Sequence, residues 1–526
     1  MCACSAIYVL AGALPFAMLV GCSSSRGSMT MESTSVQPGN VSATGNPLVA
    51  SYEFTPNRAA QVSVQFGTDT SYGLSTSSQQ TTENGNSVVI LVAGMIANTT
   101  YHMRAVAQFA DGTTENDYDH TFTTGSLPSG LIPSSTVTPT SGMTPQPGIE
   151  LVDMIGGETQ SLAFATDLQG NTIWEYPFPD RQPASILYPI RLLPNGNFIC
   201  MIAPASQSSV GGPTPAGTLN VIREFDLSGT TIQQLTMDDL NTRMAAAGFN
   251  VTLQLFSHDI VQLPNGHLLV IANTIKPFTN LPGYPGVTNV VGDVVIDLDS
   301  NWQPVWYWNE FDHLDVNRHP MSFPDWTHTN SVTYSPDDGN FIVSIRHQNW
   351  IVKVDYRDGA GTGDIVWRLG EGGDFALQGA TDPTDWFYAQ HNAIFTSPNS
   401  TGSFQLAIMD NGNDRLFPQG VTCGNTDSPA CLYSTAMVMQ VDEEAKTASF
   451  VFHYFPPNLY SGFAGDTAPQ PNGNIESDFA GVGSDSYIQE VTPTSSPTIV
   501  WQMHITGSNS YRAYRMPSLY PGVQWQ

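Results

Sequence analysis

The residues best suited to chemistry in this chain are three histidines that share one position in a repeated sequence. His258, His328 and His391 each open a short apolar strand that runs into a turn, in the segments SHDIVQLPNG, THTNSVTYSPDDG and QHNAIFTSPNSTG. Such a repeat is typical of one blade in a circular array of sheets, where equivalent positions face a shared axis. Because only 11 of the 526 residues are histidines, three at one register predict a single pocket.

Other polar residues join these histidines by counting along the strands. The strand after His328 turns and returns as NFIVSIR, so antiparallel pairing predicts Arg346 near His328. Asn330, two residues after His328, is predicted on the same face. In the first repeat Tyr188 replaces the histidine, six residues before the proline of a Pro-Asn-Gly turn. The other histidines show no such register and are expected to be ordinary: His102, His120, His267, His313, His319, His347, His453 and His504.

Several imidazoles beside a guanidinium suit an anionic group that bears several oxygens, such as a sulfate or phosphate ester. One imidazole can attack as a nucleophile while another protonates the leaving oxygen. Three histidines can also bind Zn²⁺, but Arg346 at the same rim would oppose a cation. The sequence contains no CxxC or HExxH signature. We therefore expect no metal at this site.

Six alternating segments predict the sheets that must position these residues. Each reads as a strand, a turn and a second strand usually rich in Trp or Tyr, at 163–176, 220–235, 294–308, 352–369, 437–454 and 488–503. Six such units predict an all-β protein with a six-bladed β-propeller over 148–526. An irregular β-sandwich is the alternative.

The chain before the propeller is predicted to contain a second, smaller domain. Residues 51–124 alternate as in a β-sandwich, and IANTTY followed by HMRAVAQF resembles the tyrosine-corner region of fibronectin type III-like domains. Residues 23–50 are interpreted as a flexible tether, and 125–147 as a Pro/Ser/Thr linker.

Residues 1–22 are predicted to be a signal peptide. An apolar stretch ends in Leu19-Val20-Gly21-Cys22, which is similar to a bacterial lipobox, although no Lys or Arg precedes it. We expect export and lipidation of Cys22, and hence a periplasmic or cell-surface lipoprotein of a Gram-negative bacterium held on the membrane by its lipid anchor. An ordinary secretory signal is the alternative.

The net charge and the cysteines indicate which binding partners and which cellular compartment to expect. The formal net charge of −29 excludes nucleic acid as an expected partner, because such a surface repels phosphate backbones. Cys423 and Cys431 enclose a short loop, and an oxidising compartment favours a disulfide between them. Cys200 stands alone in an apolar strand and is expected to be buried. The sequence does not decide the oligomeric state, and a homodimer is compatible with it.

The segments around these residues resemble bacterial arylsulfate sulfotransferases. The resemblance lies in SHDIVQLPNGHLLV, DWTHTNSVTYSPDDGNFIVSIRHQNWIVKVD, VWRLG, AQHNAIF, MDNGNDR and YRAYRMPSLYP, and it covers roughly 147–526. It implies a periplasmic enzyme with an N-terminal β-sandwich and a six-bladed propeller, which works without a nucleotide sulfate carrier or other cofactor. It also implies a small loop disulfide where Cys423 and Cys431 lie.

Within that resemblance, His391 matches a nucleophile that becomes a sulfohistidine. His328, Arg346 and His258 match residues that bind and polarise the sulfuryl group, and Asn330 matches a supporting polar residue. Tyr188 is expected to contact substrate. The implied reaction moves a sulfuryl group from an aryl sulfate ester to a phenolic acceptor in a ping-pong sequence. Two alternatives remain: a hydrolase of sulfate or phosphate esters that uses the same pocket, and a non-catalytic binding propeller.

Overall fold

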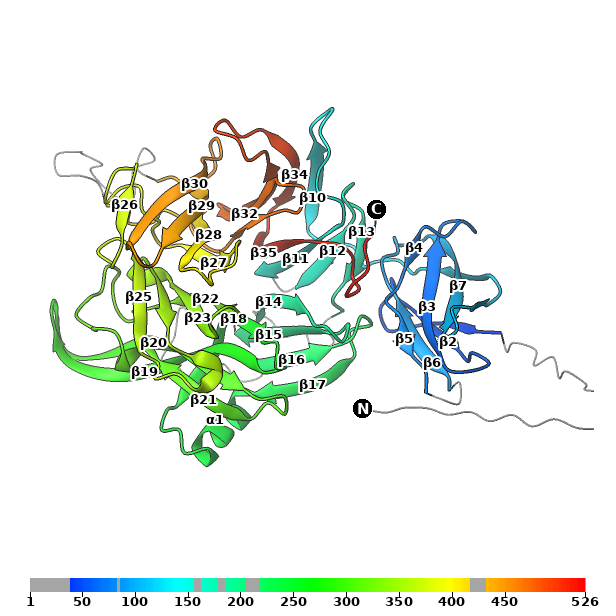
Figure 1. Cartoon of the computed structure of the whole chain (residues 1–526), viewed down its shortest axis with the longest axis horizontal. Helices are drawn as coiled ribbons and strands as arrows, with labels where there is room; N and C mark the ends of the chain where they lie inside the picture. Colours follow the sequence, from blue (N-terminus) through cyan, green and yellow to red (C-terminus); the bar gives the residue numbers. More distant parts are fainter. Residues whose placement is uncertain are drawn as a thin grey trace, which may run out of the picture. The chain divides into compact units, whose positions relative to one another are not determined.

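The computed structural model describes residues 38–82, 86–155, 162–177, 185–204, 218–416 and 432–525, which belong to one compact unit. These residues form antiparallel sheets with very little helix (Figure 1). The one α-helix among them is α1 (Met237–Ala246), and no helix there is long and apolar enough to cross a membrane. Cys22, Cys423 and Cys431 lie outside the described residues, so lipidation and the disulfide stay predictions.

Two sheets make up the first part of the chain. One contains β1 (Asn40–Ala43), β2 (Ala50–Phe54) and β6 (Val88–Val92). The other contains β3 (Ala60–Gly67), β4 (Leu74–Ser75), β5 (Gln79–Gln80), β7 (Thr100–Phe109), β8 (Thr114–Asn116) and β9 (His120–Thr123). Alternate side chains of β3 are fully buried, as the sequence pattern predicts. The Tyr101 hydroxyl accepts a hydrogen bond from Ile96 N at 3.0 Å. Strand β1 lies inside the segment predicted as a tether.

Six sheets follow in the described residues. Their strands are β11 (Ile149–Ile155), β12 (Ala163–Thr166), β13 (Thr172–Glu175) and β35 (Asn509–Met516); β14 (Ser185–Leu192), β15 (Phe198–Pro204), β16 (Val221–Phe225) and β17 (Thr231–Thr236); and β18 (Leu253–Gln262), β19 (Leu268–Leu281), β20 (Tyr284–Leu298) and β21 (Pro304–Asn309). The fourth contains β22 (Thr329–Ser335), β23 (Asn340–Ile345), β24 (Trp350–Val354) and β25 (Ile365–Gly370).

The last two sheets have five strands each. One contains β26 (Ala376–Gln378), β27 (His391–Phe395), β28 (Ser403–Asp410), β29 (Thr435–Asp442) and β30 (Thr447–Tyr454), with β26 parallel to β30. The other contains β31 (Asp466–Pro469), β32 (Ile475–Val482), β33 (Asp485–Val491), β34 (Ile499–Thr506) and β10 (Ser134–Pro139). Strand β10 lies within the predicted linker, so that part of the segment is structural. Its Pro/Ser/Thr composition hides an edge strand that pairs antiparallel with β34.

Each of the six segments predicted from the sequence forms a strand pair in one of these sheets: β12–β13, β16–β17, β20–β21, β24–β25, β29–β30 and β33–β34. We call inner strands the edge strands β35, β14, β18, β22, β27 and β31, which carry polar residues. In chain order, β14 contacts β18, β18 contacts β22, β22 contacts β27 and β27 contacts β31. Strand β35, at the edge of the first sheet, contacts β14 and β32, and its neighbour β11 also contacts β14 (Figure 1).

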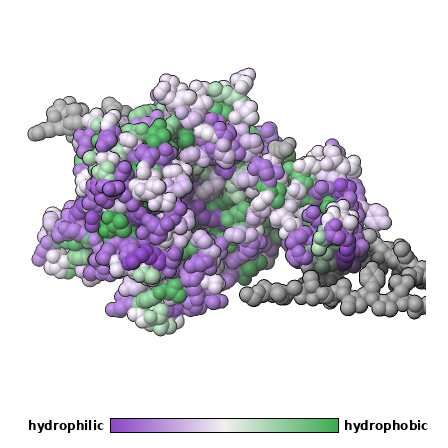
Figure 2. All heavy atoms as spheres, viewed as in Figure 1, coloured by the Kyte–Doolittle hydropathy of each residue, from purple (hydrophilic) through white to green (hydrophobic). Residues whose placement is uncertain are grey.

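Apolar side chains fill the space between neighbouring sheets. Trp308, Phe341, Val343 and Val295 belong to one buried cluster shared by the β18–β21 and β22–β25 sheets. Burial of large side chains of this kind supplies most of the favourable free energy of such a fold. Figure 2 shows that the visible face is mainly hydrophilic, with apolar residues in separate patches. Cys200 is fully buried and unpaired, as expected, and burial raises the pKa of its thiol to about 12.

Buried carboxylates link strands of neighbouring sheets. Asp259 Oδ2 accepts a hydrogen bond from Val332 N at 3.1 Å, and Asp153 Oδ2 accepts one from Ile190 N at 3.0 Å. Arg512 pairs with Asp259 at 3.2 Å and donates to Asn330 O at 2.7 Å. Unpaired main-chain groups at buried strand ends would be costly, so these side chains fix how strands of neighbouring sheets align.

Candidate active site

Pairing of the inner strand is interrupted at the same place in four consecutive sheets. The register shifts lie between Tyr188 and Ile190, Phe256 and Ile260, Thr329 and Ser331, and His391 and Ala393. In addition, His258 and His328 have φ values of 62° and 53°. Bulges re-aim side chains, and non-glycine residues with positive φ persist only where the surroundings hold them. Each of these four strands is therefore distorted at or next to the residue that it contributes, although the distortions differ in length.

Aromatic contacts join three of the predicted residues. The ring of Tyr188 stacks on His258 with centroids 5.3 Å apart, and the His258 ring meets the edge of His328 at 4.5 Å. Ser257 Oγ lies 2.5 Å from His258 Nδ1. Burial, followed by the nearby His328, holds the pKa of His258 well below its ordinary value. His258 is therefore a neutral ring whose position is fixed from both sides.

His391 is the most enclosed histidine of the group, with 2% of its surface exposed. Its Nδ1 lies 2.6 Å from Asn411 Oδ1, while Asn411 Nδ2 donates to Ser461 O and Ala464 O at 2.8 and 3.0 Å. Because the amide nitrogen makes both donor contacts, Oδ1 must accept, and the proton of neutral His391 lies on Nδ1. The lone pair is then on Nε2, which accepts from Ala464 N at 3.2 Å.

The charge state of His391 follows from its surroundings. Burial, followed by the neighbouring Arg346, holds its pKa well below the ordinary value. A neutral imidazole with a fixed Nδ1 proton has the form that a nucleophilic Nε2 requires. The return of the β27–β28 hairpin ends at Asp410, and the next residue, Asn411, contacts His391.

Arg346 lies at the return of the hairpin, as predicted, and its N donates to His328 O at 3.4 Å. It begins a 3-10 turn (Arg346–Gln348) directly after β23. Its Nη1 lies 2.6 Å from His347 Nε2, and its Nη2 donates to Gly462 O at 3.2 Å. Its buried Nε has no hydrogen-bond partner within the residues described. Buried donors are seldom left unpaired, so this nitrogen is available to a ligand oxygen.

His347 is the functional neighbour that the register argument missed. Its ring stacks on His328 at 4.6 Å, and its Nδ1 lies 2.8 Å from Asp325 O. Burial, followed by His328 and Arg346, lowers its pKa to about 3. His347 directly follows Arg346 in the sequence, so the predicted position of Arg346 also indicates that His347 lies near His328.

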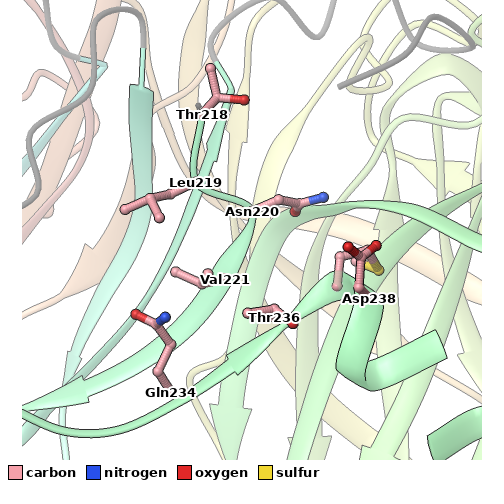
Figure 3. Close-up of a pocket in the computed structure, with 8 residues that line it drawn as sticks. Thr218, Leu219, Asn220, Val221, Gln234, Thr236 and Asp238 are labelled. Carbon is pink, nitrogen blue, oxygen red and sulfur yellow. The ribbon is translucent and has the colours of Figure 1, made fainter. Parts of the chain in front are cut away.

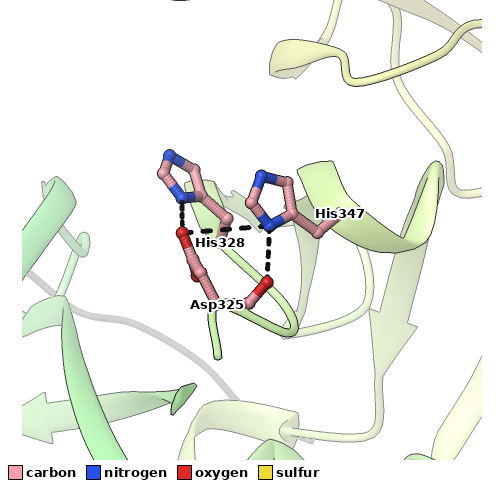
Figure 4. Close-up of side chains that lie close together, drawn as sticks. All are labelled: Asp325, His328 and His347. Carbon is pink, nitrogen blue, oxygen red and sulfur yellow. Dashed lines mark hydrogen bonds and ion pairs between the residues drawn. The ribbon is translucent and has the colours of Figure 1, made fainter. Parts of the chain in front are cut away.

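Asp325 completes this group, because its Oδ2 lies 2.5 Å from His328 Nδ1 (Figure 4). Asp325, His328 and His347 place possible metal ligands within 4.8 Å of one another. The contacts disfavour a metal, however. His347 Nδ1 donates to a carbonyl, and its Nε2 lone pair accepts from Arg346, so no lone pair faces Asp325.

The remaining predicted and unpredicted residues support the rings. Asn330 is fully buried and its Nδ2 donates to Gln390 O at 2.7 Å, so it fixes the residue before His391. Tyr511, which sequence reasoning gave no role, donates to His258 O at 3.1 Å and lies 5.3 Å from the Tyr188 ring. Burial raises the pKa of Tyr511. Tyr511 lies on β35, which is outside the repeated segments, so the sequence gives no sign of its role beyond its place in the motif YRAYRMPSLYP.

A separate pocket lies on the second of the six sheets, between β16, β17 and the start of α1 (Figure 3). Its lining is made of small polar and aliphatic residues: Thr218, Leu219, Asn220, Val221, Gln234, Thr236, Met237 and Asp238. None of the clustered histidines lines it, and it contains no cationic side chain. It is therefore distinct from the candidate active site.

Residues 136–515, which include every clustered residue, match the family model described as Arylsulfotransferase (ASST). No curated protein matches the chain. Among solved structures, a putative 6-phosphogluconolactonase from Bacteroides fragilis is 11% identical, with 86% of this chain and 98% of that chain covered and a TM-score of 0.33. A member of the duf4221 family from Bacteroides vulgatus is 7% identical, with coverage of 73% and 98% and a TM-score of 0.33. TM-scores this low do not show a shared fold or a shared function.

Proposed function

Because the chain belongs to the arylsulfotransferase family, which implies aryl sulfotransferase activity, we propose that it acts by a ping-pong mechanism through His391. The donor is an aryl sulfate ester and the acceptor is a phenol, and neither a nucleotide sulfate carrier nor another cofactor is required. The observation that carries this proposal is the buried, neutral His391, whose Nδ1 proton is held by Asn411.

In the first half-reaction, His391 Nε2 gives its lone pair to the sulfur and forms an N–S bond. The S–O bond to the aryl group breaks, and its electron pair leaves with the phenolate oxygen. Nε2 must exchange its contact with Ala464 N for the sulfur. The ring becomes positively charged beside the retained sulfonate, and Asn411 Oδ1 stabilises it by accepting a hydrogen bond from Nδ1–H. Arg346 binds the sulfuryl oxygens, where negative charge is concentrated.

The second half-reaction reverses these changes with a different phenol. The acceptor phenol gives its proton to His328, which gave one to the departing phenolate in the first half-reaction. The acceptor oxygen attacks the sulfur, and the N–S bond breaks to return a neutral His391. One pocket must hold donor and acceptor rings in turn, and we place that pocket beside the stacked rings of Tyr188 and His258. His258, His328 and Arg346 surround the transferred group in this scheme.

We also propose that the six sheets are the blades of one propeller, with residues 51–124 as a fibronectin type III-like domain. The chain-order contacts of the inner strands and the pairing of β35 with β11 support a circular arrangement. In such an array the four strand distortions lie at one rim, which accounts for how residues from Tyr188 to His391 meet.

The rival function is hydrolysis of the same esters with water as acceptor. Purified protein is incubated with p-nitrophenyl sulfate, with and without added phenol. Transfer predicts rapid nitrophenol release only with phenol, together with phenyl sulfate as product. Quenching with donor alone should leave an adduct with the mass of SO3 on the peptide that contains His391. Release that is independent of phenol, or an adduct on His328 or His258, contradicts the proposal.

Export with lipidation of Cys22 is a further proposal, supported by the lipobox-like Leu19-Val20-Gly21-Cys22. Cys22→Ser should move the mature protein from the membrane fraction to the soluble fraction without changing its activity in detergent-free assay. Under the same export, Cys423 and Cys431 should form a disulfide, which closes a short loop and contributes about 2–3 kcal/mol. Mass spectrometry of a non-reduced digest distinguishes the linked peptides from two free thiols.

A further inference from the structure

We propose that Asp325 is a positioning residue that holds both the proton donor and the sulfuryl ligand of the site, His328 and Arg346. The inference deepens the proposed function and rests on it. Asp325 acts on His328 through its carboxylate and on Arg346 through its own main-chain carbonyl. A single residue in the loop before β22 would then align the two side chains that face the negative charge developing in the transfer step.

The first contact joins the carboxylate to the proton donor. Asp325 Oδ2 lies 2.5 Å from His328 Nδ1, and a carboxylate can only accept, so Nδ1 carries a proton. Burial would raise the pKa of Asp325, but the charge and hydrogen bond of His328 outweigh it and lower that pKa, so the carboxylate stays ionised. With Nδ1 turned to the carboxylate, Nε2 lies at the opposite side of the ring, where we place the proton that is given to the leaving group.

The second contact acts through the backbone. His347 Nδ1 donates to Asp325 O at 2.8 Å, which leaves the lone pair of that neutral ring on Nε2. That lone pair accepts from Arg346 Nη1 at 2.6 Å. The guanidinium is thereby turned so that its unpartnered Nε remains free for a sulfuryl oxygen. His347 transmits the position of Asp325 to Arg346 and touches no substrate atom in this scheme.

Asp325 itself is held by an extension of the neighbouring sheet. Val291 on β20 forms a parallel bridge with Asp325, and its N and O bond to Pro324 O at 2.8 Å and Trp326 N at 3.0 Å. The side chains of Phe323 and Trp326 pack with Leu281 and Val290 of the same hairpin in a buried cluster. This anchoring makes the loop a rigid support, as a residue that aligns two others requires.

The proton balance gives the inference a specific consequence. When the S–O bond breaks, the His328 Nε2 proton passes to the phenolate oxygen, and His328 becomes neutral while Asp325 remains an anion. In the second half-reaction the acceptor phenol returns its proton to Nε2. Loss of the carboxylate weakens this proton transfer most for donors whose phenols have a high pKa, because such leaving groups need protonation most.

The test compares Asp325→Asn with wild type on a series of aryl sulfates whose phenols span a wide pKa range, from p-nitrophenyl sulfate to phenyl sulfate. We expect kcat/KM to fall about tenfold for p-nitrophenyl sulfate and about 100-fold or more for phenyl sulfate. The plot of log kcat/KM against phenol pKa should steepen. Asp312→Asn is the matched control, since Asp312 is an exposed aspartate of the same loop.

His347→Gln separates the two contacts. It removes the contact with Arg346 and the ring that stacks on His328, but it leaves the bond between Asp325 and His328 in place. It should therefore lower kcat/KM by a similar factor for all donors and leave the slope unchanged. An unchanged slope in Asp325→Asn, or a steepened slope in His347→Gln, overturns the inference. Should Asp325→Asn fail to fold, Asp325→Ser must show the steepening instead, because it also lacks the carboxylate. A wild type that forms no adduct on His391 refutes the proposed function itself, whereas an adduct with unchanged slopes refutes only the role of Asp325.

Discussion

Two regions of this molecule bury ionisable residues, and they differ in how completely the charges are paired. On β35, Arg515 is surrounded by the carboxylates of Glu150, Glu476 and Glu490, each at 2.8 Å. Arg346 makes no ion pair anywhere in the part of the chain that the structure describes, and its buried Nε has no partner. Arg515 is neutralised by three carboxylates of the fold, whereas Arg346 has no carboxylate partner and can bind an anion. A buried cation without a carboxylate thus distinguishes a site from a scaffold.

The largest expected effect separates chemistry from folding. His391→Ala should lower kcat for transfer by about 10⁴-fold or more, the scale seen when a covalent nucleophile is removed. Its cost in the free energy of unfolding should be only about 1–3 kcal/mol, because Asn411 Oδ1 and Ala464 N each lose one buried partner. Stopped assays and denaturant titration measure the two quantities. Turnover close to wild type would show that another residue carries the sulfuryl group.

The converse change should affect the scaffold and leave the chemistry intact. Arg515→Met removes the cation from three buried carboxylates and should lower the free energy of unfolding by about 3–5 kcal/mol. At a temperature where the variant remains folded, kcat/KM per folded molecule should match wild type. A fall in kcat/KM per folded molecule would show that the ion pairs of Arg515 also support the active site.

A charge-conserving change at the site should have an intermediate effect. Arg346→Lys keeps a cation but loses the planar fork, so transition-state stabilisation should fall by about 2 kcal/mol or more, roughly 30-fold in kcat/KM. Arg368→Lys, at a partly exposed arginine paired with Asp374 at 3.7 Å, is the matched control. A lysine variant with near-full kcat/KM would show that Arg346 does not bind the sulfuryl oxygens.

The smallest effect is a pair of opposite pH dependences. His347 has its pKa lowered to about 3 from 6.5, so the unfolded chain binds more protons between these values and stability falls as pH falls through that range. Asp466 has its pKa raised to about 7 from 3.8 by burial, so the folded chain binds more protons and stability falls as pH rises through 4 to 7.

Two variants test these signs against wild type. Relative stability of His347→Gln should increase on going from pH 6.5 towards pH 3, and that of Asp466→Asn should increase from pH 4 towards pH 7, each by on the order of 1 kcal/mol per pH unit. Urea titrations at a series of pH values measure both. Curves that stay parallel to wild type would show that the native pKa values are ordinary.

The sequence predicted the strand pairs and the meeting of the histidines because both depend on repetition. An alternating segment followed by a turn has one local solution, and it recurs at equal positions in successive sheets. Arg346 followed from hairpin counting alone. The bulges at Asn330 and Asn392 could not be predicted, because they arise from contacts with neighbouring strands rather than from local preference.

Contacts between distant segments were also beyond the sequence. Asp325 is held by a bridge to Val291 on β20, and Tyr511 reaches His258 from β35. Neither has a periodicity to reveal it. Strand β10 was hidden for a different reason, since an exposed edge strand tolerates the Pro, Ser and Thr that also occur in linkers.

The pairing of β35 with β11 also bears on the order in which the chain can fold. Strand β11 leaves the ribosome early, but the partner that completes its sheet emerges only after all the intervening strands. That same late strand carries Tyr511 and Arg512, which bond the main chain at His258 and Asn330. A partly synthesised chain therefore cannot assemble the pocket, so catalysis would begin only once the last strand has been delivered.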